Sequence, residues 1–412
     1  MEHEDSVPLR WHLLWRVAFR FWFLYFVGKL FIYEPVVSWV AARLFQAQLP
    51  LVVSTTGSGD KTYDWVRAFC VLCLAVAGTL LWSVLDRRRP NYLVLQRWLN
   101  LLLRFSLGGI LLSFGFGKVV PLQMPFPSLT RLLQPYGEFS PMGVLWSSIG
   151  ASPGYEMFTG WVEVVAGTLV LLPFTARFGV LLCLAVATQV FVLNMTYDVP
   201  VKLLSFDLIL HSLVLMVPEV PRLLRFFFSN GPVDAATSAE LFVSPRKNKI
   251  AVALQIVILV GALGVGGWVA RSSWSDSAGG APKPELYGIW EVSRLVIDDK
   301  VREPLLTDEI YIRRIIFDFA GPSTMTIQTP SGAMTNLLTE FDAKSQTVTL
   351  TYQGATKWRA SLRYAQPAKD ALVLDFALGE RKYHIEAKRF DLNRFPLLNR
   401  GFHWVQEYPF NR

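Results

Sequence analysis

Long apolar stretches are the feature that most constrains this chain. A helix that crosses a bilayer needs about 20 mostly apolar residues. About seven stretches of the sequence reach or approach that length, over residues 14–33, 65–85, 98–119, 157–174, 178–195, 201–217 and 250–270. The sequence therefore predicts a membrane α-helical bundle with about seven transmembrane helices.

The composition agrees with a membrane protein. Charged residues make up 17% of the chain and hydrophobic residues 52%, whereas soluble domains carry about 25% charged residues. The net charge is +8, and basic residues such as Arg87-Arg88-Arg89 and Arg246-Lys247 lie beside apolar stretches. A nucleic-acid-binding protein gathers its basic residues on one face of a soluble fold. We therefore predict membrane lipids as partners and no nucleic acid.

The basic residues also predict an orientation. Segment 86–97 holds four arginines and one aspartate, and segment 218–249 holds three arginines and two lysines. The positive-inside rule places both segments on the cytoplasmic side. Alternation of the helices then predicts a multi-pass protein of the plasma (inner) membrane with a cytoplasmic N-terminus. Everything after residue 270 is predicted to be extracytoplasmic.

The periodicity changes after a linker-like segment, 271–286, which is rich in Ser, Gly and Pro. Alternating runs bounded by turn residues then read as strands, over 288–297, 310–319, 323–329, 336–341, 346–352, 357–364, 371–377 and 382–389. Eight short strands joined by tight turns predict a C-terminal all-β antiparallel barrel. A closed barrel and an open sandwich both remain compatible with this pattern.

Charged side chains inside predicted spans are the candidate functional residues, because each costs about 3 kcal/mol at a helix centre. Lys118 ends the third predicted span and Glu163 lies within the fourth. We predict that they form a buried pair, functional or structural. Asp207 and His211 lie four residues apart in the sixth span, and hence on one helix face.

Further polar residues crowd the turn between the fifth and sixth predicted spans, namely Asn194, Tyr197, Asp198 and Lys202. We predict that the polar residues, His211 apart, line one cavity in the outer half of the membrane, beneath the Pro-rich segment 120–156. That segment reads either as a partly helical lid or as an interfacial loop with an aromatic belt. Lys118 could instead extend to the headgroups, and Asp198 could cap the next helix.

Small residues predict where helices pack closely. Gly109, Ser113 and Gly117 recur every four residues in the third span, and Gly160 and Gly167 lie in the fourth. Such residues let membrane helices approach one another. We therefore expect both sets to lie at helix–helix contacts.

Cofactor motifs are sparse. The sequence contains no P-loop, dinucleotide fingerprint or H-E-x-x-H motif, and only one histidine falls in a predicted span, so neither a nicotinamide, a haem nor a metal site is predicted. Cys70 and Cys73 spell C-x-x-C within an apolar stretch, whereas redox pairs lie at exposed helix N-termini. We expect a packing role for them.

Several of these residues occur in a familiar order. Gly117-Lys118 ends one helix, Glu163-Val-Val-Ala-Gly167 lies in the next, and Arg177 and the stretch Asn194–Lys202 follow. On these features, residues 98–218 resemble the DoxX-like family of four-helix membrane proteins. The resemblance implies a link to quinone-dependent oxidation of sulfur compounds or to redox complexes, as for some relatives, or to assembly, as for others.

The chain extends beyond this pattern on both sides. Its first strand opens with Gly288-Ile-Trp290, which is similar to the G-x-W of lipocalin-like domains. The predicted organisation is a two-helix segment (1–97), a DoxX-like unit with the segment 120–156 as its outer lid (98–218), a cytoplasmic loop with the seventh helix (219–270), a linker (271–286) and a lipocalin-like barrel (287–412).

These observations predict a redox-associated membrane protein that binds a quinone or small apolar ligand in the outer polar cavity. Lys118, Glu163 and His211 would handle protons. The ligand contacts would come from Asn194, Tyr197, Asp198, Lys202 and Asp207. One alternative is a lipid or apolar-ligand transport module with a cavity inside the barrel. Another is a non-enzymatic assembly factor that docks a membrane or extracytoplasmic protein partner.

Overall fold

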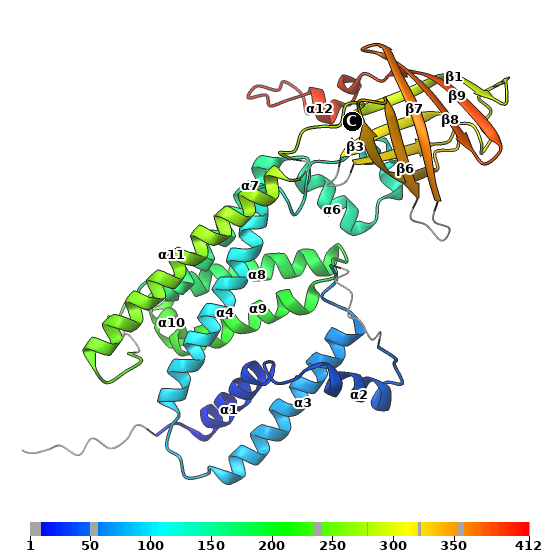
Figure 1. The fold of residues 1–412 in the computed structure, drawn as a ribbon. Coiled ribbons are helices and arrows are strands. Elements are labelled where there is room, and N and C mark those ends of the chain that lie inside the picture. Colours follow the sequence, from blue (N-terminus) through cyan, green and yellow to red (C-terminus); the bar gives the residue numbers. More distant parts are fainter. Residues whose placement is uncertain are drawn as a thin grey trace, which may run out of the picture. The chain divides into compact units, whose positions relative to one another are not determined.

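The computed structural model describes residues 10–49, 57–233, 240–277, 279–319, 323–352 and 358–411. They form two compact units (Figure 1). One unit comprises Met1–Val119 and Met157–Val269, and the other comprises Val120–Glu156 and Ala270–Arg412. Each unit is described by itself.

The first unit is helical. Its main elements are α1 (Leu13–Gly28), α2 (Glu34–Leu44), α3 (Thr62–Leu85), α4 (Leu93–Val119), α7 (Pro153–Leu171), α8 (Ala176–Thr196), α9 (Lys202–Met216), the 3-10 turn η2 (Val217–Glu219), α10 (Val220–Phe228) and α11 (Pro245–Ser275).

Five of the described helical segments are long and apolar enough to cross a membrane by length and composition: α3, α4, α8, the run of α9 to α10 (Lys202–Phe228) and α11. The prediction of a multi-pass membrane protein is confirmed at this level. The helices at the first and fourth predicted spans, α1 and α7, fall outside this group. With 16 residues, α1 is about 24 Å long, less than the roughly 30 Å of a hydrocarbon core.

Glycines allow α4 and α7 to approach closely. A Cβ atom at Gly160 of α7 would lie 2.6 Å from Val119 N and 2.8 Å from Gly115 O of α4. One at Gly167 would lie 2.9 Å from Gly108 O. The predicted packing role of Gly160 and Gly167 is confirmed. The prediction for Gly109 and Gly117 is wrong, because a Cβ at either would meet no atom within 4 Å, and Gly108 and Gly115 form the contact instead.

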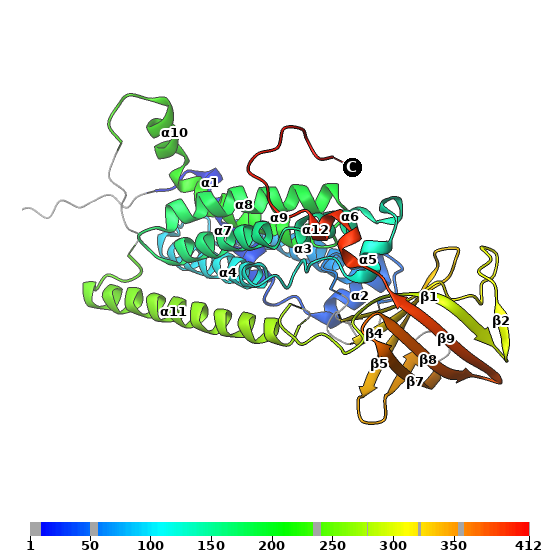
Figure 2. The same cartoon turned by 90° about the horizontal axis from the view of Figure 1, so that it is seen from above.

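The second unit contains a closed antiparallel barrel. Its strands are β1 (Gly288–Ile297), β2 (Lys300–Arg302), β3 (Arg314–Phe319), β4 (Ser323–Gln328), β5 (Met334–Asp342), β6 (Thr347–Tyr352), β7 (Trp358–Ala368), β8 (Ala371–Leu378) and β9 (Arg381–Arg389). Neighbours pair in sequence from β3 to β9, and β1 pairs with both β3 and β9. Figure 2 shows β1 beside β9.

The predicted barrel is therefore confirmed, and its closure decides against a sandwich. The pairing of β1 with β9 runs from Trp290 opposite Arg389 to Ile297 opposite Tyr383. Two details differ from the prediction. The short β2 is an addition that pairs with the end of β1, and the strand expected over 310–319 begins at Arg314.

The barrel interior is filled by its own side chains. Trp290, Phe317, Leu350, Leu374 and Ile385 are among the buried residues of one apolar core. Such filling is usual for eight-stranded barrels. The Trp290 indole also donates a hydrogen bond to Leu286 O at 2.9 Å. The packing gives no support to a ligand cavity inside the barrel, which the transport alternative requires.

The segment 120–156 belongs to the barrel unit, which the sequence did not predict. It forms α5 (Leu129–Leu133), the 3-10 turn η1 (Tyr136–Glu138) and α6 (Pro141–Gly150). Leu129 is buried against Ile289 and Ile316, whose side chains lie on the outer face of the barrel. The carboxylate of Asp318 accepts a hydrogen bond from Leu129 N at 2.7 Å. This segment therefore covers the outside of β1 and β3.

The segments before β1 and after β9 also pack against the barrel. The 3-10 turn η3 (Leu392–Arg394) and α12 (Pro396–Asn399) follow β9, and Phe390 and Phe395 pack on the same outer cluster as α5. The predicted linker 271–286 is shorter than expected, because α11 continues to Ser275. Leu286, at its other end, is fully buried.

Candidate functional site

The predicted pair of Lys118 and Glu163 is confirmed. Lys118 Nζ and Glu163 Oε1 lie 2.5 Å apart, and the side chains are 9% and 5% exposed. Gly160 makes this contact feasible, since a Cβ there would lie 2.8 Å from the Lys118 Cβ. The second carboxylate oxygen, Glu163 Oε2, is buried and has no hydrogen-bond partner in the described part of the chain. The pair thus has capacity for one further hydrogen bond.

Asp207 of α9 lies in a different cluster. It forms an ion pair with Lys29, which follows α1, and Tyr25 donates a hydrogen bond to its carboxylate at 3.4 Å. His211 Nδ1 lies 2.7 Å from Asp207 O. A carbonyl oxygen only accepts hydrogen bonds, so Nδ1 carries the hydrogen. The His211 ring packs edge-on against Phe26, with centroids 4.5 Å apart.

Lys29 and Tyr25 were not predicted as site residues. The available signal was Lys29 itself, a charge near the end of the first apolar stretch. A charge in such a position requires a partner. Once Glu163 is paired with Lys118, Asp207 is the carboxylate that remains in the predicted spans.

The polar residues between α8 and α9 form a third group. Asn194 Nδ2 donates to Ser205 Oγ at 3.0 Å. Lys202 pairs with the exposed Asp198 at 2.9 Å, while Tyr197 is the half-buried C-cap residue of α8. Asp60, rather than Asp198, caps α9, since its carboxylate accepts hydrogen bonds from the backbone N–H of Lys202 and Leu203.

These contacts assign the predicted residues to three groups rather than to one cavity. Lys118 and Glu163 join α4 to α7, and Asp207 and His211 join α9 to α1. Asn194 holds α8 to α9. Each group pairs polar side chains at one helix–helix junction, with Glu163 Oε2 left without a partner among the described residues.

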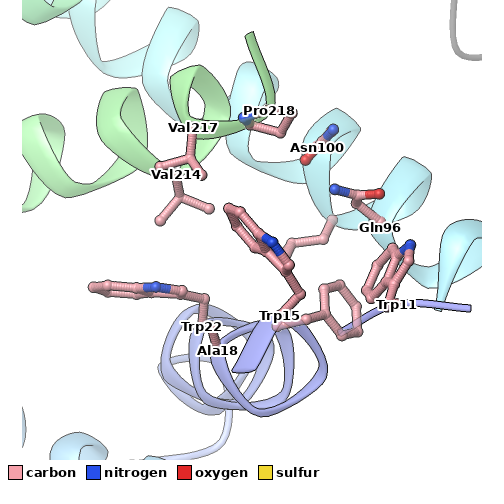
Figure 3. Close-up of a pocket in the computed structure, with 11 residues that line it drawn as sticks. Trp11, Trp15, Ala18, Trp22, Gln96, Asn100, Val214, Val217 and Pro218 are labelled. Atoms are coloured by element: carbon pink, nitrogen blue, oxygen red, sulfur yellow. The ribbon is translucent and has the colours of Figure 1, made fainter. Parts of the chain in front are cut away.

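A cavity of about 400 Å³ lies instead between α1, α4 and the end of α9 (Figure 3). Its wall consists of aromatic, aliphatic and carboxamide side chains and contains no charged residue among those described. The lining residues are Trp11, Trp15, Ala18, Phe19, Trp22, Gln96, Leu99, Asn100, Val214, Val217 and Pro218. Figure 3 shows the Trp15 indole extending from α1 toward Val214 and Val217.

The polar atoms of this cavity are open to a ligand. Gln96 and Asn100 lie one turn apart on α4 and are half-buried. The described residues form no hydrogen bond with either carboxamide or with the indole N–H of Trp11, Trp15 or Trp22. Amide and indole N–H groups that are only half-buried can hydrogen-bond a ligand that enters the cavity. The cavity therefore offers several N–H donors and two carbonyl acceptors, with aromatic faces beside them.

A buried arginine fixes two walls of the cavity. Arg20 of α1 is 1% exposed and donates to Tyr92 Oη and Ser83 Oγ, each at 2.9 Å, and to Asp86 O at 2.8 Å. Tyr92 directly precedes α4, so this network ties the tryptophan face of α1 to the carboxamide face of α4. Burial raises the pKa of Tyr92, while the bond from Arg20 opposes the shift. The Tyr92 hydroxyl in turn donates to Asp86 at 2.9 Å.

The cavity had a signal in the sequence that was not used. Trp11, Trp15 and Trp22 are spaced by four and seven residues, which places them on one helix face. Gln96 and Asn100 are likewise one turn apart at the start of an apolar helix. Neither pattern indicates by itself that the two faces meet.

Metal and disulfide chemistry receive no support from the described residues. They contain no group of three or more His, Cys, Asp or Glu side chains that could hold a metal ion. Cys70, Cys73 and Cys183 are free thiols, with Cys70 buried and Cys73 exposed.

Comparison with known proteins leaves the family open. No protein-family model and no solved structure matches the chain. A curated relative, the uncharacterized protein YwoB of Bacillus subtilis (strain 168), is 28% identical over 92 residues. These residues are 22% of this chain and 59% of YwoB, so the match spans less than two thirds of the relative. The resemblance to the DoxX-like family remains a prediction.

Proposed function

We propose that this multi-pass membrane protein binds a neutral amphipathic ligand of the quinone class in the cavity between α1, α4 and α9. The proposal is supported mainly by the chemistry of the cavity wall. Among the described residues, the wall has three tryptophans, two carboxamides without hydrogen-bond partners and no charged side chain. This site replaces the outer polar cavity as the proposed binding site.

The wall suits a planar head group that carries carbonyl oxygens. A ring stacked on an indole gains about 0.5–1.5 kcal/mol beyond its buried area. Carbonyl oxygens can accept hydrogen bonds from the carboxamides of Gln96 and Asn100, and a hydrogen bond of this kind contributes about 0.5–1.5 kcal/mol. A charged head group would lose its hydration without gaining an ion pair. The volume of about 400 Å³ is within the usual range of ligand sites, about 300–1,000 Å³.

A redox role is a second candidate function. Quinone reduction consumes protons, and a carboxylate or a histidine near the ligand can supply them. His211 is the proposed proton carrier beside this cavity, since it lies one turn before the lining residue Val214 on α9. The Lys118–Glu163 pair, whose Glu163 Oε2 has no partner among the described residues, would handle protons at a separate place, because Lys118 lies 18 residues beyond Asn100 on α4, about 27 Å along the helix. The role also agrees with the proposed resemblance of residues 98–218 to the DoxX-like family. It is compatible with the proposed topology, in which the N-terminus is cytoplasmic and the barrel is extracytoplasmic.

Ligand binding is tested on the full chain purified in mild detergent. Co-purified small molecules are identified by mass spectrometry and optical spectroscopy. A short-chain quinone is then titrated while tryptophan fluorescence is followed. We expect saturable quenching, and at least tenfold weaker binding for the Gln96→Leu/Asn100→Leu variant. Gln255→Leu is the matched control, because Gln255 is a buried carboxamide of α11 that does not line the cavity.

The outcomes separate the proposals. Equal quinone affinity in the cavity variant and the control would reject the site. A co-purified neutral lipid with no quinone binding would retain the site and reject the quinone class. If quinone binds, quinone-dependent turnover unchanged in Glu163→Gln would reject the proton-handling role. A stable protein partner without any bound ligand would favour the assembly-factor alternative.

A further inference from the structure

Helix α10 has two chemically different faces. At 100° per residue, Val220, Leu223, Leu224 and Phe227 lie on one side. Arg222 and Arg225 lie on the other, with Phe226 beside Arg222. Leu223 packs against the apolar core of the helical unit. The polar face therefore points away from that core.

An ion pair indicates where α10 begins relative to the membrane boundary. Arg177, at the start of α8, donates to Glu219, just before α10, at 2.8 Å, and both side chains retain solvent access. With 21 residues, α8 is about 32 Å long, which matches the roughly 30 Å of a hydrocarbon core. The start of α8 therefore lies at one membrane boundary. Glu219 lies at the same boundary, and α10 begins just beyond it.

The chain nevertheless exposes large aromatic side chains in α10. Phe226, Phe227 and Phe228 are 66%, 66% and 83% exposed. Three adjacent phenylalanines open to water would form an unfavourable apolar patch. Pro218 in η2 and Pro221 in the first turn of α10 remove backbone donors at the junction with α9, which allows α10 to leave the direction of the span.

Positive charge gathers at the same end of the helical unit. Phe242, just before α11, packs against Trp98 in the second turn of α4, with centroids 5.9 Å apart. This contact places the start of α11 near the start of α4, and Figure 2 shows α10 at the end where α11 begins. The exposed basic residues described at this end are Arg10, Arg87, Arg88, Arg89, Arg225, Arg246, Lys247 and Lys249, against the exposed acidic residue Glu240.

We propose that α10 is an anchor helix that lies on the bilayer surface and selects anionic phospholipids. Phe227 and Leu224 insert at the boundary between head groups and acyl chains, as in interfacial amphipathic helices. Arg225, and Arg222 beyond its ion pair with Glu219 at 3.5 Å, contact lipid phosphates, and the neighbouring basic residues add to the attraction. The assignment is independent of ligand binding in the tryptophan cavity.

The depth of α10 is tested with spin labels in vesicles of phosphatidylcholine and phosphatidylglycerol. Single cysteines replace Arg222, Leu224, Arg225 and Phe227 in a chain whose native cysteines are changed to serine or alanine. We expect labels at 224 and 227 to be accessible to oxygen, and labels at 222 and 225 to a water-soluble nickel chelate. Four labels open to the chelate would place α10 in water. Four labels open only to oxygen would make α10 a continuation of the span, and either result overturns the proposal.

Lipid selectivity is tested by the phosphatidylglycerol retained after extraction from the same vesicles. Each basic residue near an anionic surface contributes about fivefold in binding. Arg222→Gln/Arg225→Gln should therefore lower the retained ratio of phosphatidylglycerol to phosphatidylcholine at least fivefold. The control Arg294→Gln/Arg302→Gln removes two exposed charges from the barrel and should leave the ratio unchanged. Equal ratios in the two variants would overturn the selectivity.

Discussion

Lys118 Nζ and Glu163 Oε1 lie 2.5 Å apart between α4 and α7, with both side chains less than a tenth exposed. Neither charge has bulk water to stabilise it, so each depends on the other. The close approach at Gly160 brings the two helices near enough for this contact.

Loss of one partner should be worse than loss of both. Glu163→Leu leaves a buried lysine unpaired, and we expect a destabilisation of about 3–5 kcal/mol. Lys118→Met/Glu163→Leu removes both charges and should recover most of that loss. Unfolding in detergent, analysed as a double-mutant cycle, measures the coupling. Additive effects would show that the pair contributes no specific stabilisation.

The glycines of α4 can be tested by their different surroundings. A Cβ at Gly115 would lie 2.8 Å from Val164 Cγ2 and 3.0 Å from Gly160 O, whereas one at Gly117 would meet no atom within 4 Å. Gly115→Ala should therefore cost about 1–3 kcal/mol through overpacking. Gly117→Ala should be neutral or slightly stabilising through helix propensity. Thermal unfolding of both variants checks this contrast, and a reversed order would exclude the close contact of α4 with α7.

The attachment of α5 to the barrel depends on one buried carboxylate. Asp318 accepts hydrogen bonds from Leu129 N at 2.7 Å and from Phe319 N at 2.8 Å. Asp318→Ala leaves these donors without a partner, at a cost of about 1–3 kcal/mol. Amide exchange over 129–133 should then become faster. Asp375→Ala, which removes an exposed carboxylate of β8, is the control and should leave that exchange unchanged.

Tyr364 should make the barrel unit sensitive to alkaline pH. Burial, and then the hydrogen bond of its hydroxyl to Glu285 at 2.8 Å, raise its pKa from 10 to about 12. The folded state thus holds the phenol proton more tightly than the unfolded state. The resulting stabilisation is complete below pH 10 and is lost as the pH rises through about 12.

Tyrosinate absorbance and unfolding across this pH range measure the effect. Tyr364→Phe should remove the part of the tyrosinate signal that titrates near pH 12 and reduce the loss of stability between pH 10 and 12. Glu285→Gln should bring the pKa of Tyr364 back toward 10. A titration of Tyr364 near pH 10 in the unmodified chain would contradict the expected shift.

Local patterns were sufficient for much of the fold. Period-two alternation and turn residues placed the barrel strands, because each strand needs only its own pattern and its flanking turns. Barrel closure was not determined in this way. Trp290 opposite Arg389 joins strands about one hundred residues apart, and no local pattern specifies that pairing.

For the candidate functional residues, too, the sequence predicted the local features and not the long-range contacts. Lone charges in apolar stretches identified Lys118 and Glu163, since the cost of burying a charge is evident from the sequence. Lys29 as the partner of Asp207, and Gly108 and Gly115 as the packing face of α4, depend on how each helix is rotated about its axis. The sequence leaves that rotation open when apolar residues surround the helix.

The sequence by itself determined that this chain enters a membrane, that it carries a separate antiparallel barrel, and that a few buried charges need partners. Only the tertiary structure brought Trp15, Asn100 and Val217 to one cavity. Burial and periodicity act on neighbouring residues and are therefore evident in the sequence. A cavity exists where faces of three distant segments fail to fill the space between them, and that depends on the packing of the whole helical unit.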